Sequence, residues 1–374
     1  MTTSMVRGEI LPIALPSCVA VTGTGGFIGG RLAQLLACEP GVTDVRAFSR
    51  RECRDKHTQV VQLDDEDALR EALQGCGALV HSAFDMYDIG SNLRIARTIG
   101  LVCAKARVRL VHISTAAIYE PLPAGDLDER YPAQRTDAYR AIKATIEDDF
   151  VRLSQDEGLD VVILQPTIVY GPAGRAWTDS PVRDLLHGSV VLPNEGKGLC
   201  NAVFVDDVCQ AAIKAISAQV PSGERFLISG PYPEEWRYFF GAYDSMVGGG
   251  GLELQPAGNT EPALPPPAQA PVIARDGPIS AVKNAIYSRL SARTRSRLNM
   301  AFRQLSKSLG RETARVPTGD TLSLYSSQCN IRIDKARRFL GYNPEFDLKK
   351  GMANTKSYVQ QTYAHHVVRR KKYI

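Results

Sequence analysis

The chain contains no run of about 18 uninterrupted apolar residues, the length that a transmembrane helix requires. We therefore expect no membrane-spanning segment, although 44% of the 374 residues are hydrophobic and suffice for a large core in about two domains. Residues 1–16 include two prolines, one Arg and one Glu, and no sustained apolar stretch. This composition is not that of a secretory signal, so we interpret 1–16 as a flexible leader of a cytoplasmic protein.

Paired cysteines are also absent from the sequence. The eight cysteines are scattered, without a C-x-x-C pair or a cluster of Cys and His. This distribution predicts reduced thiols rather than a disulfide framework, and it predicts no metal site. The net charge of +5 is modest, and neither a nucleic-acid-binding motif nor an interleaving of aromatic with basic residues occurs. We therefore expect no nucleic-acid partner.

The most informative segment that is present is a glycine-rich turn. A short apolar run leads into residues 22–29, which read Thr-Gly-Thr-Gly-Gly-Phe-Ile-Gly. Gly23 permits a tight turn, Gly26 lets backbone N–H groups approach a pyrophosphate, and Gly29 lets a helix pack closely on a strand. A turn of this kind can also be purely structural, so the interpretation needs a second, independent signal.

That second signal is Tyr139 followed four residues later by Lys143, in a stretch typical of a helix. The spacing places both side chains on one helix face, although a helix can carry this pair without any chemistry. A nearby ammonium group favours phenolate, so we expect Lys143 to lower the pKa of Tyr139 from about 10 and to make it a general acid or base. Upstream, Thr115 is a candidate hydrogen-bond donor to a substrate oxygen, assisted by Ser114.

Strand-like and helical segments alternate along the first half of the chain. The expected strands are 18–22, 45–49, 60–63, 78–82, 109–114 and 161–165. Such alternation indicates right-handed βαβ units and a parallel sheet covered on both faces, which is a Rossmann-type, doubly wound α/β fold. A cofactor would lie across the carboxyl ends of the strands.

Six elements in this order resemble the extended short-chain dehydrogenase/reductase family, which includes nucleotide-sugar epimerases and dehydratases and the 3β-hydroxysteroid dehydrogenases. Three of them are the glycine turn, the strand end from Thr115 to Tyr119, and the pair of Tyr139 and Lys143. The other three are Gln-Pro-Thr-Ile-Val-Tyr-Gly-Pro at 165–172, Val-Asp-Asp-Val at 205–208 and Lys-Ala-Arg-Arg-Phe-Leu-Gly-Tyr-Asn-Pro at 335–344. The resemblance covers residues 17–230 and 324–360.

The resemblance implies a role for each of these residues. Tyr139 would be the general acid/base, Lys143 would hold the nicotinamide ribose, and Thr115 would polarise the substrate oxygen. His81, at the end of a strand, would be structural. The residues expected to bind the cofactor are Gly23, Gly25, Gly26, Phe27, Ile28, Gly29, Arg50, Arg51, Gln62, Leu63, Ser82, Ala83, Tyr139, Lys143, Pro166, Thr167 and Ile168.

The end of the second expected strand bears on the choice of cofactor. An acid there bonds the ribose hydroxyls of NAD, whereas Arg accommodates the 2′-phosphate of NADP. Residues 48–51 read Phe-Ser-Arg-Arg, without an acid, so Arg50 and Arg51 favour NADP(H) over NAD(H) unless both are solvated surface residues. Gln62 and Leu63 stand where the family usually has an Asp near the adenine, and Gln can both donate and accept hydrogen bonds.

The substrate class is less well determined by the sequence. The family points first to a nucleotide-linked sugar undergoing oxidation, reduction or epimerisation. However, the Arg that many such enzymes have shortly before the 205–208 motif is absent from residues 199–204. A 3β-hydroxysteroid-dehydrogenase-like enzyme acting on an apolar alcohol is therefore an alternative, and a non-catalytic NADP-binding sensor is another. The intact set of Thr115, Tyr139 and Lys143 argues against the sensor.

The second half of the chain is expected to form a smaller, mostly helical substrate-binding domain from residues 176–199 and 231–360. Residues 17–175 would form the dinucleotide-binding domain, to which 200–230 return, and 361–374 would be a basic tail. Residues 280–311 contain eight Lys or Arg and no Asp or Glu. They form an amphipathic stretch that is a solvated helix face, a peripheral membrane contact or a clamp for an anionic substrate. A homodimer would suit the family resemblance.

Overall fold

The computed structural model describes residues 14–49, 58–86, 88–188, 190–257, 317 and 319–370, without the side chains of 365–370. Several sequence predictions lie outside the described residues. They concern the leader up to residue 13, the arginines at 50 and 51, the basic segment 280–311, and the tail beyond residue 370.

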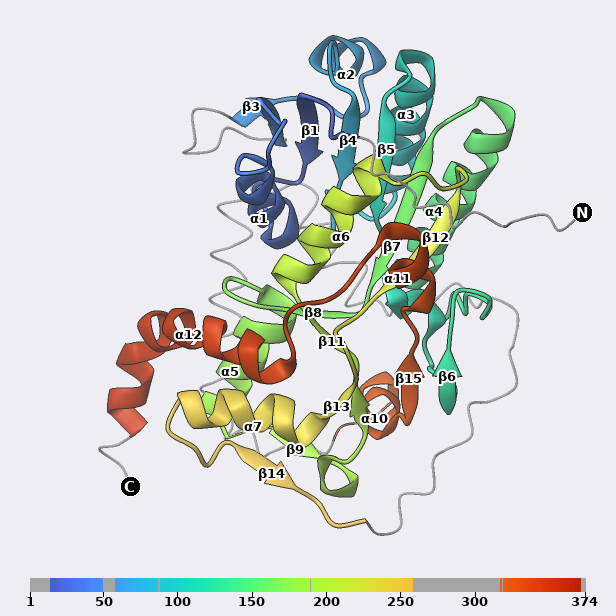
Figure 1. The fold of residues 1–374 in the computed structure, drawn as a ribbon. Coiled ribbons are helices and arrows are strands. Elements are labelled where there is room, and N and C mark those ends of the chain that lie inside the picture. Colours follow the sequence, from blue (N-terminus) through green and yellow to red (C-terminus); the bar gives the residue numbers. More distant parts are fainter. Residues whose placement is uncertain are drawn as a thin grey trace, which may run out of the picture.

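The central element is a seven-stranded sheet with the order β12-β7-β5-β4-β1-β2-β3 (Figure 1). Every neighbouring pair of its strands is parallel, which confirms the predicted Rossmann-type α/β fold. The strands end within a few residues of the predicted positions. Their bounds are β1 (Cys18–Thr22), β2 (Asp44–Ser49), β3 (Thr58–Val60), β4 (Ala78–His81), β5 (Arg109–Ile113), β7 (Val161–Pro166) and β12 (Glu224–Ile228).

Helices cover both faces of this sheet, because alternate side chains of each strand point to opposite sides. Val19 and Val21 of β1 belong to one hydrophobic cluster with α1 and α6, whereas Cys18 and Ala20 belong to a second cluster with α3 and α4. Figure 1 shows α6 crossing the sheet on the face toward the viewer. The helices are α1 (Phe27–Leu36), α2 (Glu66–Ala72), α3 (Ser91–Ala106), α4 (Ala138–Asp156) and α6 (Val205–Ser217).

The remaining elements gather below the carboxyl ends of the central strands in Figure 1. The helices there are α5 (Ser180–Leu186), α7 (Trp236–Met246), α10 (Gly319–Ser326), α11 (Asp334–Leu340) and α12 (Leu348–Arg370). Short strand pairs connect them: β8 (Ile168–Tyr170) with β11 (Ala202–Phe204), β9 (Val190–Leu192) with β14 (Leu252–Leu254), β10 (Leu199–Cys200) with β13 (Glu234–Glu235), and β6 (Gly125–Leu127) with β15 (Cys329–Ile331). The exact domain boundaries stay predictions.

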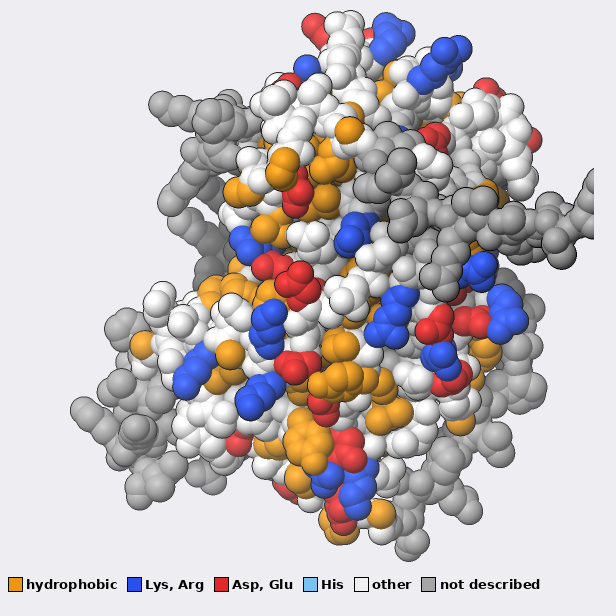
Figure 2. All heavy atoms as spheres, viewed as in Figure 1, with side chains coloured by type: hydrophobic (Ala, Val, Ile, Leu, Met, Phe, Trp, Pro, Cys, Tyr) orange, Lys and Arg blue, Asp and Glu red, His pale blue; other side chains and the backbone are white. Residues whose placement is uncertain are grey.

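Charged side chains of both signs are mixed on the face of the molecule that Figure 2 shows. On the face in Figure 2, basic and acidic side chains lie next to one another over the described residues. Within the same part of the chain, no helix is long and apolar enough to cross a membrane. The described residues also contain no group of three or more His, Cys, Asp or Glu arranged to hold a metal ion.

Candidate active site

The glycine turn after β1 is closely packed and leaves the start of α1 open. Gly23 has φ +75, and a Cβ there would lie 2.8 Å from the backbone nitrogen of Ala83. A Cβ on Gly29 would lie 2.5 Å from both the carbonyl oxygen of Gly23 and Oγ of Ser82. Gly26 caps α1 without a side-chain hydrogen bond, so the first backbone N–H groups of the helix remain available to an anion.

A cleft of ≈ 940 Å³ lies at this helix start. Gly25, Gly26 and Phe27 line it, and so does the exposed side chain of Arg175, the first residue of the short π-helix Arg175–Asp179. The open N–H groups, the glycines that a Cβ would obstruct, and this guanidinium suit the pyrophosphate of a dinucleotide. The residues around this cleft therefore fit the pyrophosphate part of a dinucleotide cofactor.

A second cavity of ≈ 180 Å³ brings the predicted catalytic hydroxyl groups together. Thr115 and Tyr139 both line it, and the hydroxyl group of Thr115 acts on the phenol of Tyr139 and favours a lower pKa there. Thr115 follows β5 and caps the 3₁₀ turn Ala116–Tyr119, whereas Tyr139 lies in the first turn of α4. Two predicted cofactor-binding residues, Thr167 and Ile168, line the same cavity. A substrate oxygen placed here would meet both hydroxyl groups.

The predicted effect of Lys143 on Tyr139 is not what the structure shows. Burial raises the pKa of Tyr139 above its ordinary value, and the hydroxyl group of Thr115 only partly offsets this increase. The prediction that the Lys143 ammonium lowers this pKa is therefore wrong for the protein alone, because desolvation of the phenol is the larger effect. The chain by itself holds Tyr139 as a neutral phenol, the form that donates a proton.

Lys143 is buried in α4, one helical turn after Tyr139. Its Nζ donates to the carbonyl oxygen of Ile113 at 3.3 Å and lies 4.4 Å from the ring centroid of Phe84. The edge-to-face contact of Phe84 with Tyr139, at 5.4 Å between centroids, places one aromatic ring against both predicted catalytic residues. Burial lowers the pKa of Lys143 to about 8, and the nearby Glu147 carboxylate opposes that shift.

Glu147 is a central residue that the sequence analysis missed. It is 1% exposed, and it accepts hydrogen bonds from Ser114, from Gln165 at 2.9 Å and from Arg225 at 2.8 Å. The predicted assistance of Ser114 to the substrate is therefore wrong, because its buried hydroxyl group is used by this carboxylate. The available signal was the spacing, since Glu147 follows Lys143 by four residues on the same helix face.

The other predicted residues occupy different surroundings. Ser82 donates from Oγ to the carbonyl oxygen of Thr22 at 2.6 Å, which places it and Ala83 beside the glycine turn. Pro166 ends β7 and is buried. Gln62 is exposed, and the buried side chain of Leu63 packs in the core. None of these three residues lines either cavity.

His81 has the structural environment expected of it. Its Nδ1 lies 2.8 Å from Oγ1 of Thr22, and burial lowers its pKa to about 3. The imidazole is therefore neutral, and it connects the ends of β4 and β1 rather than facing the cavity of Thr115 and Tyr139.

The family of this chain follows from its match to a known protein family. The model of the NAD dependent epimerase/dehydratase family matches residues 19–229, which is more than half of the chain. The protein belongs to this family. Its glycine turn, its Thr115 strand end, its Tyr139 and Lys143 pair and its 205–208 motif all lie within the matched range.

Individual members of the family show the range of this likeness. A dTDP-glucose 4,6-dehydratase from Streptomyces niveus is 29% identical over 243 residues, which are 57% of this chain and 72% of that protein. Cinnamoyl-CoA reductase 1 from Petunia hybrida is 27% identical over 239 residues, which are 55% of this chain and 70% of that protein. A solved dTDP-glucose 4,6-dehydratase from Streptomyces venezuelae, with NAD bound, has a TM-score of 0.64 at 20% identity and covers 93% of this chain and 98% of its own.

Membership of the epimerase/dehydratase family makes this protein an enzyme of the extended short-chain dehydrogenase/reductase type that uses a nicotinamide cofactor. The non-catalytic sensor considered as an alternative is therefore set aside. The structural likeness at 20% identity supports the fold, and the choice of cofactor and of substrate are separate questions.

The pKa of Lys143 gives this family member a specific pH dependence. In the reduction direction, we expect kcat/KM to fall as Lys143 loses its proton near pH 8. Because Glu147 raises the pKa of Lys143, Glu147→Gln should move this basic limb to lower pH. The pH profiles of kcat/KM for wild type, Glu147→Gln and the exposed control Glu157→Gln check this. A limb that stays in place in Glu147→Gln would contradict the role given to the carboxylate.

Proposed function

We propose that the protein is an NADP(H)-preferring oxidoreductase or epimerase that transfers a hydride at a C–OH or C=O carbon, most directly that of a nucleotide-linked sugar. The observation that carries this proposal is the meeting of Thr115 and Tyr139 in one cavity, with Lys143 buried one helical turn after Tyr139. A bound nicotinamide would supply the hydride. The protein would supply orientation through Thr115 and a proton through Tyr139, whose neutral phenol is favoured by burial.

The preference for NADP(H) rests on Arg50 and Arg51 following β2. We expect Arg50→Ala combined with Arg51→Ala to weaken NADP(H) binding by about tenfold or more and to leave NAD(H) binding nearly unchanged, because only NADP(H) carries the 2′-phosphate. Titration calorimetry with both cofactors checks this prediction. Equal losses for the two cofactors would assign both arginines to the solvated surface.

The cavity favours redox chemistry without loss of water. Dehydration needs one group that removes a proton from carbon and another that protonates the leaving hydroxyl group. Ala116 and Ala117, which directly follow Thr115 and line the cavity, have side chains that cannot exchange a proton. Among the described residues that line this cavity, the only carboxylate is that of Glu120, and it is ion-paired with Arg140. We therefore propose that oxidation, reduction or epimerisation, rather than elimination, is the reaction.

This proposal predicts the mass of the product. A nucleotide-linked sugar that the enzyme converts should change by two hydrogen atoms or keep its mass, and it should not lose the mass of one water. Mass spectrometry of the converted sugar nucleotide checks this. A dehydrated 4-keto-6-deoxy product would contradict the absence of an elimination pair.

The walls of the cavity also support a second candidate, an apolar carbonyl compound or alcohol. Asn201 lines the cavity, but its amide is bonded to the backbone of Cys329 and Ile331, at 2.9 Å in each case. The hydroxyl group of Thr167 lies 3.2 Å from that of Ser229. Apart from Thr115, Tyr139 and the ion-paired Glu120, the remaining walls are apolar side chains, namely Ala116, Ala117, Leu122, Ile168, Trp177, Leu199, Leu324 and Ile331. The likeness to a cinnamoyl-CoA reductase is in line with such a substrate.

A thermal-shift screen distinguishes these candidates, because a ligand that binds only the folded state raises the apparent stability. The protein is titrated first with NAD(H) and NADP(H), and then, with the better cofactor present, with UDP-glucose, dTDP-glucose, a 3β-hydroxysteroid and cinnamoyl-CoA. Stabilisation by NADP(H) followed by a sugar nucleotide supports the main proposal. Stabilisation by the steroid or the aromatic thioester alone moves the assignment to an apolar substrate, and no response to either cofactor would overturn the proposed function.

A further inference from the structure

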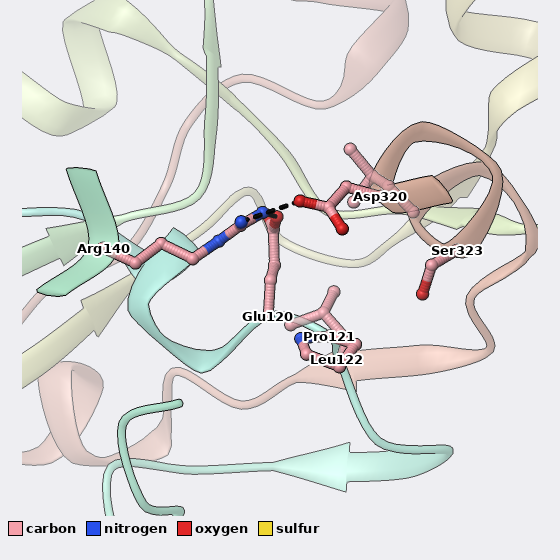
Figure 3. Close-up of a pocket in the computed structure, with 7 residues that line it drawn as sticks. Glu120, Pro121, Leu122, Arg140, Asp320 and Ser323 are labelled. Carbon is pink, nitrogen blue, oxygen red and sulfur yellow. Dashed lines mark hydrogen bonds and ion pairs between the residues drawn. The ribbon is translucent and has the colours of Figure 1, made fainter. Parts of the chain in front are cut away.

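Arg140, the residue after Tyr139, is buried in a set of polar contacts that the catalytic scheme above does not use. Its side chain is 9% exposed. Figure 3 shows it extended between Glu120 and Asp320, which approach from different elements. The guanidinium pairs with Glu120 and Asp137, and Nη1 donates to Asp320 at 2.9 Å. One buried cation therefore connects the catalytic helix to two other parts of the chain.

The first of these parts is the turn that carries Thr115. Nε of Arg140 donates to the carbonyl oxygen of Ala117 at 3.1 Å, and the backbone N–H of Ala117 donates to Oγ1 of Thr115 at 3.1 Å. Nη2 holds the carboxylate of Glu120 at the far end of the same turn. Arg140 thus binds the turn at two points, and the position of the turn sets the distance between Thr115 and Tyr139.

The second part is α10, which forms one wall of the substrate cavity. Asp320 lies in the first turn of α10, and Leu324 of the same helix lines the cavity. At the other end of the helix, the carbonyl oxygen of Leu324 accepts a hydrogen bond from Nε1 of Trp236 at 3.1 Å. The ion pair of Asp320 with Arg140 is therefore a direct contact between α10 and the catalytic helix.

We propose that Arg140 is a positioning residue that couples the placement of α10 over the substrate cavity to the alignment of Thr115 with Tyr139. This role rests on the proposed function, since it requires that the cavity bind the substrate. The planar guanidinium is suited to it, because its donors reach Ala117, Glu120 and Asp320 at the same time. A lysine ammonium group at this position would keep the positive charge, but it lacks the planar set of N–H donors that reaches three partners at once.

Hydrogen exchange of the full-length protein tests the coupling without any substrate. Arg140→Lys should increase exchange of residues 115–120 and of α10 by about tenfold. The side chain of Asp320 is 78% exposed, so Asp320→Asn should leave the fold intact. This variant should also increase exchange at 115–120. Combined with Arg140→Lys, it should cause no further increase in exchange. Asp67→Asn is the matched control, because Asp67 is 83% exposed and pairs with Arg70.

Kinetics with the substrate found in the screen then separate positioning from simple stability. Asp320→Asn should raise KM by about threefold or more with little change in kcat, because it loosens one cavity wall. Arg140→Lys should lower kcat by about tenfold, because it misaligns Thr115. Wild-type exchange at 115–120 in both Arg140→Lys and Asp320→Asn would overturn the proposal. If the protein responds to neither cofactor in the screen, the proposed function fails, while the exchange measurements still decide whether the coupling exists.

Discussion

Replacement of Tyr139 by Phe should lower turnover by about 10²–10⁴-fold, which is the usual contribution of a general acid or base. The variant loses only the hydroxyl group that meets Thr115 in the cavity, while the ring keeps its edge-to-face contact with Phe84. Cofactor affinity and thermal stability should therefore stay close to those of wild type. Steady-state kinetics and calorimetry with NADP(H) measure the two effects separately.

The matched control is Tyr232→Phe, because Tyr232 is 53% exposed and lies outside both cavities. It should leave turnover unchanged. Near-normal turnover in Tyr139→Phe would remove Tyr139 from the catalytic scheme. A loss of cofactor affinity as large as the loss of turnover would instead make it a binding residue.

The second large effect is expected at Glu147. Glu147→Ala should lower the free energy of unfolding by about 3 kcal/mol, because it leaves the buried side chains of Ser114 and Gln165, and the partly exposed side chain of Arg225, without their common acceptor. Denaturant titration measures this loss. The control Glu157→Ala, at the exposed end of the same helix, should change stability by less than about 0.5 kcal/mol. Similar stabilities of the two variants would contradict the central position of Glu147.

The fold could be predicted because its signals are local. The strand from Cys18 to Thr22 and the glycine turn after it depend on the apolar pattern and on the few residues that permit positive φ, and both are visible in the sequence. The pairing of Thr115 with Tyr139 was predicted from the family resemblance, because Tyr139 lies on a helix rather than at the end of a strand of the sheet.

The details of the site that were not predicted depend on burial and on contacts distant in sequence. The increased pKa of Tyr139 is set by burial in the folded chain, which the Tyr139 and Lys143 spacing does not reveal. Ser114 contacts Glu147, which lies more than thirty positions away, and Arg140 contacts Asp320, which lies still farther along the chain. The assignment of NADP(H) depends on Arg50 and Arg51, outside the described residues, so it remains a proposal.

The central claim is that the cavity of Thr115 and Tyr139 is where the nicotinamide reacts, and a crystal structure of the protein with NADP bound tests it most directly. The account predicts the pyrophosphate at the start of α1, the ribose within hydrogen-bonding distance of Lys143, and the nicotinamide ring at the mouth of the cavity that Thr115 and Tyr139 line. A nicotinamide ring bound away from that cavity, with Tyr139 and Lys143 making no contact with the cofactor, would contradict it.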